Sequence, residues 1–97
     1  MITSKQRAAL RALANSEEAI LQIGKGGFSD NLIKQIEDAL EARELIKVTV
    51  LENAGISTKE AMIYVCEKCA AQPVQAVGGK FIIYRRTKRK DVKKIQI

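Results

Sequence analysis

The 97-residue sequence contains no histidine and no tryptophan, and only one proline and two cysteines. The absence of histidine excludes histidine-based general-base catalysis and histidine-containing metal sites. No apolar run approaches the roughly 20 residues that a membrane-spanning helix needs. The opening segment Met1–Lys5 lacks the apolar centre of a secretory signal. We therefore expect a soluble, cytoplasmic protein.

The two cysteines, Cys66 and Cys69, have the spacing of a metal-binding or redox pair. A structural zinc site needs four ligands, and the chain offers neither a second cysteine pair nor a histidine. Both cysteines fall on the apolar stripe of a helix predicted over residues 58–71, which favours buried core thiols. A zinc ion shared by two chains is the alternative. We expect no metal, no disulfide and no other cofactor.

The positive charge is concentrated near the C-terminus. Residues 1–79 hold nine basic and ten acidic side chains, a net charge of −1, whereas residues 80–97 hold eight basic side chains and one acidic one, a net charge of +7. A neutral body with a basic end is typical of proteins that bind a polyanion. Charge alone leaves three interpretations: nucleic acid, an anionic membrane surface, or a solvated tail that aids solubility.

Length and hydrophobic periodicity predict a single domain of the α/β class. Helices are expected over residues 4–14, about 29–43 and 58–71, and strands over 19–23, 45–51, 74–77 and 80–85. Pro73 is expected to end the third helix, and Gly78-Gly79 to form a hairpin turn. The order is α-β-α-β-α-β-β, in which two β-α-β steps predict parallel pairing. A mixed four-stranded sheet packed with three helices accommodates all seven elements.

The first two helices carry charged residues at a spacing of four. In the first helix, one face is expected to hold Gln6, Ala9, Leu10 and Leu13, and Arg7 and Arg11 lie one turn apart on the other face. Like charges at this spacing destabilise a helix slightly, so a partner phosphate could explain the pair, although such pairs are also common on solvated helices. In the second helix, Glu37 and Glu41 are expected on the solvated side.

The segment Gly24-Lys25-Gly26-Gly27 joins a predicted strand to a predicted helix. Glycines let the backbone turn sharply and let another backbone approach closely. The helix start behind them, with Ser29 as N-cap, offers unpaired N–H groups, and Lys25 adds a full charge, an arrangement that suits phosphate. A tight turn without a ligand is the alternative, but one glycine would serve it.

The pattern of glycines narrows the class of phosphate ligand. The Walker A sequence is absent, and the dinucleotide-binding pattern fails because Ser29 stands where its last glycine is required. What remains is Gly-x-x-Gly from Gly24 to Gly27, the short loop that clamps an RNA backbone in KH domains. In a KH domain that loop joins two helices, whereas here it joins a strand to a helix.

Four stretches of the chain resemble the CRM domain family and, within it, the bacterial YhbY-type proteins. They are Ser4–Ala14, Gly24–Asp30, Glu44–Val48 and Val77–Arg85, so the resemblance extends over about residues 2–86. One segment departs from the family, which usually has a histidine and a Lys-Pro-like step between the first helix and the first strand. Here that segment contains Glu17-Glu18, which would repel phosphate.

The resemblance implies both a fold and a function. The implied fold is an α/β fold similar to the C-terminal domain of bacterial translation initiation factor three. The implied function is RNA binding through the Gly-x-x-Gly loop and neighbouring basic residues. Bacterial members of the family are associated with precursors of the large ribosomal subunit, and plant organelle members with group II intron splicing.

The predicted RNA-binding residues combine the loop with basic side chains. Arg85 and Arg86 leave the last strand on opposite faces, so at least one is exposed, and an arginine can contact phosphate in a bidentate manner. Phe28, beside the loop, either contacts a base or anchors the helix start. The predicted set is Gly24, Lys25, Gly26, Gly27, Arg7, Arg11, Arg85 and Arg86.

We therefore expect a non-enzymatic RNA-binding protein that contacts ribosomal RNA of a large-subunit precursor, with no membrane partner and no small-molecule substrate. No motif pairs a nucleophile with a base, or two carboxylates, for catalysis. Residues 1–86 are expected to form the RNA-binding domain, and residues 87–97 an extended or frayed basic tail. The alternative is a protein-interaction adaptor on ribosomal precursors whose tail binds RNA only non-specifically.

Overall fold

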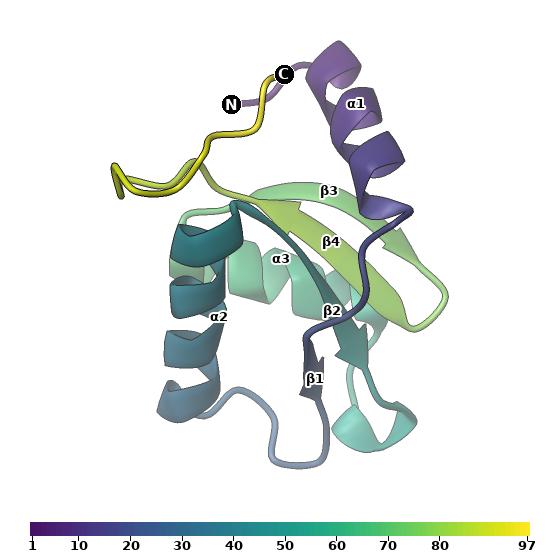
Figure 1. The fold of residues 1–97 in the computed structure, drawn as a ribbon. Helices are drawn as coiled ribbons and strands as arrows, with labels where there is room; N and C mark the ends of the chain where they lie inside the picture. Colours follow the sequence, from purple (N-terminus) through teal and green to yellow (C-terminus); the bar gives the residue numbers. More distant parts are fainter.

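The computed structural model describes residues 1–97 as three α-helices, one short 3-10 helix and four strands (Figure 1). The elements are α1 (Ser4–Ala14), β1 (Leu21–Ile23), α2 (Asp30–Arg43), β2 (Leu45–Val50), η1 (Glu52–Ala54), α3 (Thr58–Cys69), β3 (Gln72–Val77) and β4 (Lys80–Tyr84). The predicted order of helices and strands is therefore confirmed. No helix has both the length and the apolar character that crossing a bilayer requires.

Each α-helix begins at a hydroxyl N-cap that the sequence already offers. The side chains of Thr3, Ser29 and Ser57 each accept a hydrogen bond, at 3.1 Å, from the backbone N–H three residues further on. A cap of this kind satisfies one of the free N–H groups of the first turn, and it depends only on neighbouring residues. The helix starts are for this reason the most predictable part of the fold.

The end of α3 differs from the prediction. The helix ends at Cys69 because Ala70 adopts the left-handed conformation, with φ 53° and ψ 42°, and donates its N–H to the carbonyl oxygen of Cys66. Pro73 lies inside β3, where the pairing with β4 shifts register between Pro73 and Gln75. A proline is tolerated there because β3 is an edge strand, which leaves one side of its backbone unpaired.

The strand order is β1-β2-β4-β3. The parallel pairing of β1 with β2 is confirmed, but the expected pairing of β2 with β3 is wrong, because β4 folds back at Gly78-Gly79 and inserts between them in antiparallel orientation. Phe81, Ile82 and Ile83 of β4 are all buried. A strand that is apolar on both faces gains most from a central position, whereas β3 is partly exposed and takes the edge.

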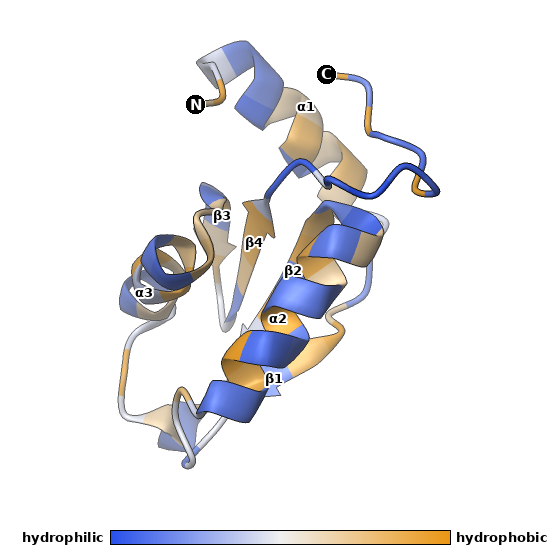
Figure 2. Ribbon diagram, turned by 90° about the vertical axis from the view of Figure 1, so that its left-hand side faces the viewer, coloured by the Kyte–Doolittle hydropathy of each residue, from blue (hydrophilic) through white to orange (hydrophobic).

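The helices cover the two faces of the sheet unequally (Figure 1). α2 and α3 bury one face over a core of 14 residues, which includes Ile36, Val48, Val65 and Phe81. α1 packs on the opposite face over a smaller cluster of six: Leu10, Ala14, Leu45, Val74, Ile82 and Tyr84. Figure 2 shows the matching hydrophobic stripes on the helices and a largely hydrophilic C-terminal segment.

Of the four residues expected to share one face of the first helix, only Leu10 is buried. Leu13 is 46% exposed, and the buried residues of α1 are Leu10 and Ala14. α1 contacts only one end of the sheet face that it covers, so two buried residues one turn apart are enough to pack the helix against the sheet. The remainder of that sheet face has no helix over it.

Candidate nucleic-acid interface

The Gly24–Gly27 loop closes as a tight turn at the carboxyl end of β1. The N–H of Gly27 donates to the carbonyl oxygen of Gly24 at 2.9 Å, which leaves Lys25 and Gly26 at the tip. Both tip residues are exposed, neither donates its backbone N–H within the protein, and Lys25 makes no ion pair. The tip therefore presents two free N–H groups and one free ammonium to solvent.

The fold explains two of the three loop glycines. Gly27 has φ +67°, which disfavours any side chain, and a Cβ on Gly24 would come within 3.2 Å of the Leu51 Cδ1 atom. A Cβ on Gly26 would meet no atom within 4 Å. Nothing inside the protein therefore requires glycine at position 26, and an external requirement is the remaining physical reason for it.

Phe28 anchors the loop to the third helix. Its ring stacks on Tyr64 of α3, with ring centroids 4.3 Å apart, and packs against the core beneath α2. The ammonium of Lys68 lies 5.7 Å from the centroid of the Tyr64 ring. Of the two roles considered for Phe28, this packing favours the anchor at the start of α2.

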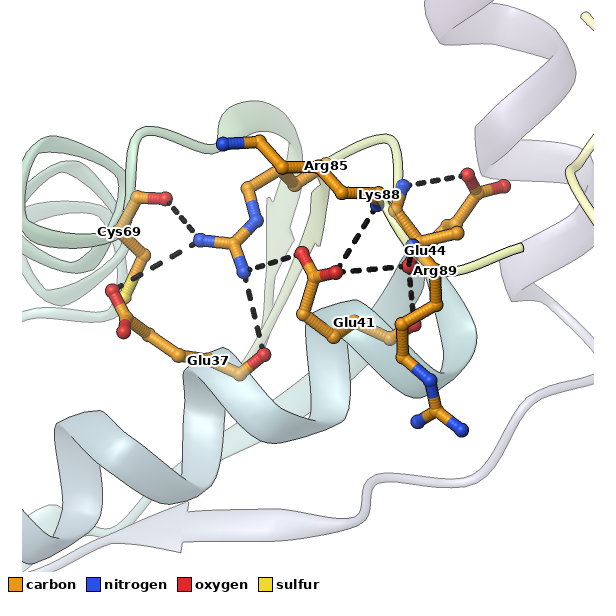
Figure 3. Close-up of polar contacts among 8 residues, drawn as sticks. Glu37, Glu41, Glu44, Cys69, Arg85, Lys88 and Arg89 are labelled. Carbon is orange, nitrogen blue, oxygen red and sulfur yellow. Dashed lines mark hydrogen bonds and ion pairs between the residues drawn. The ribbon is translucent and has the colours of Figure 1, made fainter. Parts of the chain in front are cut away.

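Arg85 is held inside the fold at the junction of α2, α3 and β4 (Figure 3). Its guanidinium donates to the carbonyl oxygen of Cys69 at 2.7 Å and to the Glu41 carboxylate at 2.9 Å, and it lies 4.0 Å from the Glu37 carboxylate. The Arg85 side chain is only 21% exposed. These contacts engage both terminal nitrogens of the guanidinium, which makes Arg85 a poor candidate for a phosphate contact.

The structure also revises the placement of Glu37 and Glu41. The sequence placed both on the solvated side of the helix, but both approach Arg85. Two glutamates four residues apart repel each other unless a cation lies between them. That spacing is the one local signal from which the pairing could have been predicted.

The other three predicted arginines differ in how free they are. Arg7 on α1 donates its Nε–H to the carbonyl oxygen of Pro73 at 3.1 Å, which ties the helix to strand β3. Arg11 is half-buried and Arg86 is exposed, and neither makes an ion pair. Arg11 and Arg86 therefore remain available to an anionic partner.

The predicted site residues fall at two ends of the molecule. The glycine loop precedes the N-terminal end of α2, whereas Arg85 and Arg86 lie beside its C-terminal end, together with α1 and both chain termini (Figure 1). The 14 residues of α2 span about 20 Å. Arg85 and Arg86 consequently do not extend the surface of the loop, which they would have done only if the end of the last strand lay beside the loop.

The C-terminal segment 87–97 forms neither helix nor strand, but it is tied to the body rather than frayed. The Glu44 side chain is completely buried, and its two carboxylate oxygens accept the N–H groups of Thr87 at 2.8 Å and Ile95 at 2.7 Å. Glu41 accepts further hydrogen bonds from the Thr87 hydroxyl and the Lys88 N–H. Sequence reasoning missed Glu44, because a single glutamate after a helix carries no signal of a distant partner.

The two cysteines are buried free thiols, as predicted. Burial raises the pKa of the Cys66 thiol to about 12, with a smaller contribution from Cys69, and burial also raises the pKa of Cys69. Thiols with such pKa values are protonated at neutral pH and are poor nucleophiles. Cys66 and Cys69 therefore act as core residues.

Comparison with known proteins gives concordant matches in sequence and in structure. The CRS1 / YhbY (CRM) domain matches residues 2–85. "Probable RNA-binding protein YqeI" of Bacillus subtilis is 43% identical over 88 residues, which cover 91% of this chain and 92% of that protein. An "RNA-binding protein" of Haemophilus influenzae is 36% identical over 86 residues, which cover 87% and 85% of the two chains. The solution structure of the hypothetical protein SAV1595 from Staphylococcus aureus has a TM-score of 0.74 and 41% identity over 98% of this chain and 100% of that chain.

Proposed function

Because the chain belongs to the CRS1 / YhbY (CRM) domain family, we propose that it is an RNA-binding protein. Its binding partner is ribosomal RNA of a large-subunit precursor, as the resemblance to YhbY-type proteins implies, and it binds that RNA in the cytoplasm. Residues 1–86 form the binding domain and residues 87–97 the basic tail. The protein acts by binding alone, without a catalytic step.

The observation that supports this proposal most is the tip of the Gly24–Gly27 loop. Lys25 and Gly26 leave their backbone N–H groups free, and the Lys25 ammonium has no partner. N–H groups and a cation that point to solvent suit a phosphate oxygen. The missing side chain at Gly26 lets an RNA backbone approach the loop closely.

The remaining predicted residues divide between contact and support. Arg11, Arg86 and the tail lysines add attraction for the phosphates. Arg7 and Arg85 are given supporting roles, because their guanidinium groups already bind the carbonyl oxygens of Pro73 and Cys69. Removing Arg85 would leave Glu37 and Glu41 without their shared cation, so loss of binding in such a variant would not identify an RNA contact.

The first test is the salt dependence of binding to ribosomal RNA. If about five phosphates are neutralised, log Kd rises with log salt concentration with a slope of about four. Lys25→Ala should weaken binding and reduce that slope by about one, with the melting temperature unchanged. A salt-independent Kd would contradict the electrostatic mechanism, and a Lys25→Ala variant with wild-type slope would remove the loop from the site.

The alternative is an adaptor whose tail binds RNA non-specifically. A variant in which only the charge of the tail is changed distinguishes the adaptor from the proposed RNA-binding protein. Deleting residues 87–97 is unsuitable, because it would leave the buried Glu44 carboxylate without its two N–H donors. Changing Lys88, Lys90 and Lys93 to glutamine keeps those backbone contacts. The loop-centred binder retains most of its RNA affinity in this variant, whereas the adaptor loses most of it.

A further inference from the structure

Half of one sheet face has no helix over it. Along β2, Ile46, Val48 and Val50 belong to the core under α2 and α3, so the alternating residues Lys47 and Thr49 point to the opposite face, where α1 packs. α1 covers only the end of that face where its own cluster lies. The uncovered half adjoins the Gly24–Gly27 loop.

Strand pairing brings one residue of each strand together in a row across the uncovered half. The row is Gln22, Thr49, Lys80 and Val77, each paired with the next across β1, β2, β4 and β3. Gln22, Val77 and Lys80 are exposed, and Thr49 is half-exposed. Lys47 and Gln75 flank Ile82 one row further toward α1. We use the term open sheet face for the following six residues: Gln22, Lys47, Thr49, Gln75, Val77 and Lys80.

The open sheet face is cationic. The four strands contain no aspartate or glutamate, and neither Lys47 nor Lys80 makes an ion pair. The two lysines are diagonal neighbours across β2 and β4, a position that places their stems about 7–8 Å apart. The connection between α1 and β1 contains two acidic residues, Glu17 and Glu18. It meets β2 at Ile20, whose N–H donates to the carbonyl oxygen of Lys47.

The helical side of the molecule carries no excess of positive charge. α2 carries four acidic and two basic residues, and α3 carries two of each. A polyanion held by the loop is therefore repelled from the α2 side and attracted to the open sheet face. That face also lies between the loop and the end of the molecule that holds Arg11 and Arg86 (Figure 1).

We infer that the open sheet face binds the minor groove of an RNA double helix, an inference that rests on the proposed RNA-binding function. The minor groove of A-form RNA is wide and shallow and displays 2′-hydroxyls, so a nearly flat protein surface can reach them. The amide of Gln22 and the hydroxyl of Thr49 can exchange hydrogen bonds with a 2′-hydroxyl. Lys47 and Lys80 contact the bordering phosphates.

The composition of the face excludes the base-stacking mode of RNA-binding sheets. Recognition of single strands on a sheet needs exposed aromatic rings. The only aromatic residue on this side of the sheet, Tyr84, is buried under α1. A duplex read by its sugars and phosphates is therefore the form of RNA that the face fits.

The test uses the full chain, an RNA duplex of about 16 base pairs and a DNA duplex of the same sequence. The double variant Lys47→Gln/Lys80→Gln should weaken RNA-duplex binding and lower the log–log salt slope by about two. Lys34→Gln/Lys59→Gln is the matched control, because it removes the same charge from exposed positions of α2 and α3. Thr49→Val, which keeps the shape of a strand residue, should reduce the preference for RNA over DNA.

The outcomes separate this inference from the proposed function. A wild-type protein that binds neither ribosomal RNA nor the duplex would overturn the proposed function itself. If the wild type binds RNA and Lys25→Ala weakens that binding, but the double variant binds the RNA duplex as its control does, only the inference about the sheet is overturned.

NMR titrations test the open sheet face directly. The amides of Gln22, Thr49 and Lys80 should shift when duplex is added. Shifts of the same amides with protein concentration alone would assign the face to a second copy of the chain and contradict the inference.

Discussion

At the scale of single residues, local contacts could be predicted from the sequence and distant contacts could not. The caps Thr3 and Ser29 follow from a hydroxyl placed before an amphipathic run, which involves only neighbouring residues. Arg85 and Glu41 lie 44 positions apart, and only the packing of β4 beside α2 brings them together. The same long-range packing removed Arg85 from the set of free cations, while Lys25 stayed at an exposed tip.

Glu41 links stability to pH. The hydrogen bond from the Lys88 backbone N–H is the main cause that lowers the pKa of Glu41, and Thr87 and Arg85 lower it further against the opposing effect of burial. A carboxylate with a lowered pKa in the folded state stabilises the protein above its unfolded pKa, and this contribution disappears as the pH falls through the folded pKa. Stability should therefore fall in acid, below about pH 4.

The measurement is urea unfolding of the wild type and Glu41→Gln between pH 7 and pH 3. The difference in unfolding free energy between the two proteins should be largest at neutral pH and shrink in acid. Asp38→Asn removes the same charge from the same helix, where the only partner is Lys34 at 3.5 Å, and serves as the control. A constant difference for Glu41→Gln across this range would contradict the assigned contacts.

At the scale of elements, periodicity predicted every α-helix and strand, but not all ends and neighbours. The third helix stops at Ala70 because Ala70 adopts the left-handed conformation, which alanine rarely does. The glycine or asparagine that usually marks such a helix end is absent, so the end could not be predicted. The position of β4 between β2 and β3 is decided by which strand is apolar on both faces, a comparison among strands rather than a property of one.

The end of α3 gives a prediction about stability. Ala70 has φ 53°, where a Cβ costs about 1 kcal/mol, so Ala70→Gly should raise the free energy of unfolding by about 1 kcal/mol. Ala9→Gly is the control, since it places glycine inside α1 at an exposed position and should lower the free energy by about 1 kcal/mol. Denaturant unfolding measures both. If Ala70→Gly destabilises the protein as Ala9→Gly does, the left-handed helix end is wrong.

At the scale of the whole molecule, the structure rearranges the charge pattern that the sequence suggested. The sequence predicted one set of RNA-binding residues that combined the loop with Arg7, Arg11, Arg85 and Arg86. In the structure, the loop lies at one end, the tail is fixed by Glu41 and Glu44 at the other end, and the open sheet face lies between them. Net charge and loop composition were visible in the sequence, but their separation by the length of α2 depends on the direction of each element in the fold.

The central claim is that an RNA backbone lies directly against the Gly24–Gly27 loop, and Gly26→Val tests it most directly. A side chain at Gly26 has open space in the free protein, so the variant should keep the melting temperature of the wild type. In the complex the same side chain would occupy the place of the RNA backbone, and the affinity for ribosomal RNA should fall by about tenfold or more, equivalent to at least about 1.4 kcal/mol. A Gly26→Val protein that binds this RNA with wild-type affinity would show that the loop does not touch it.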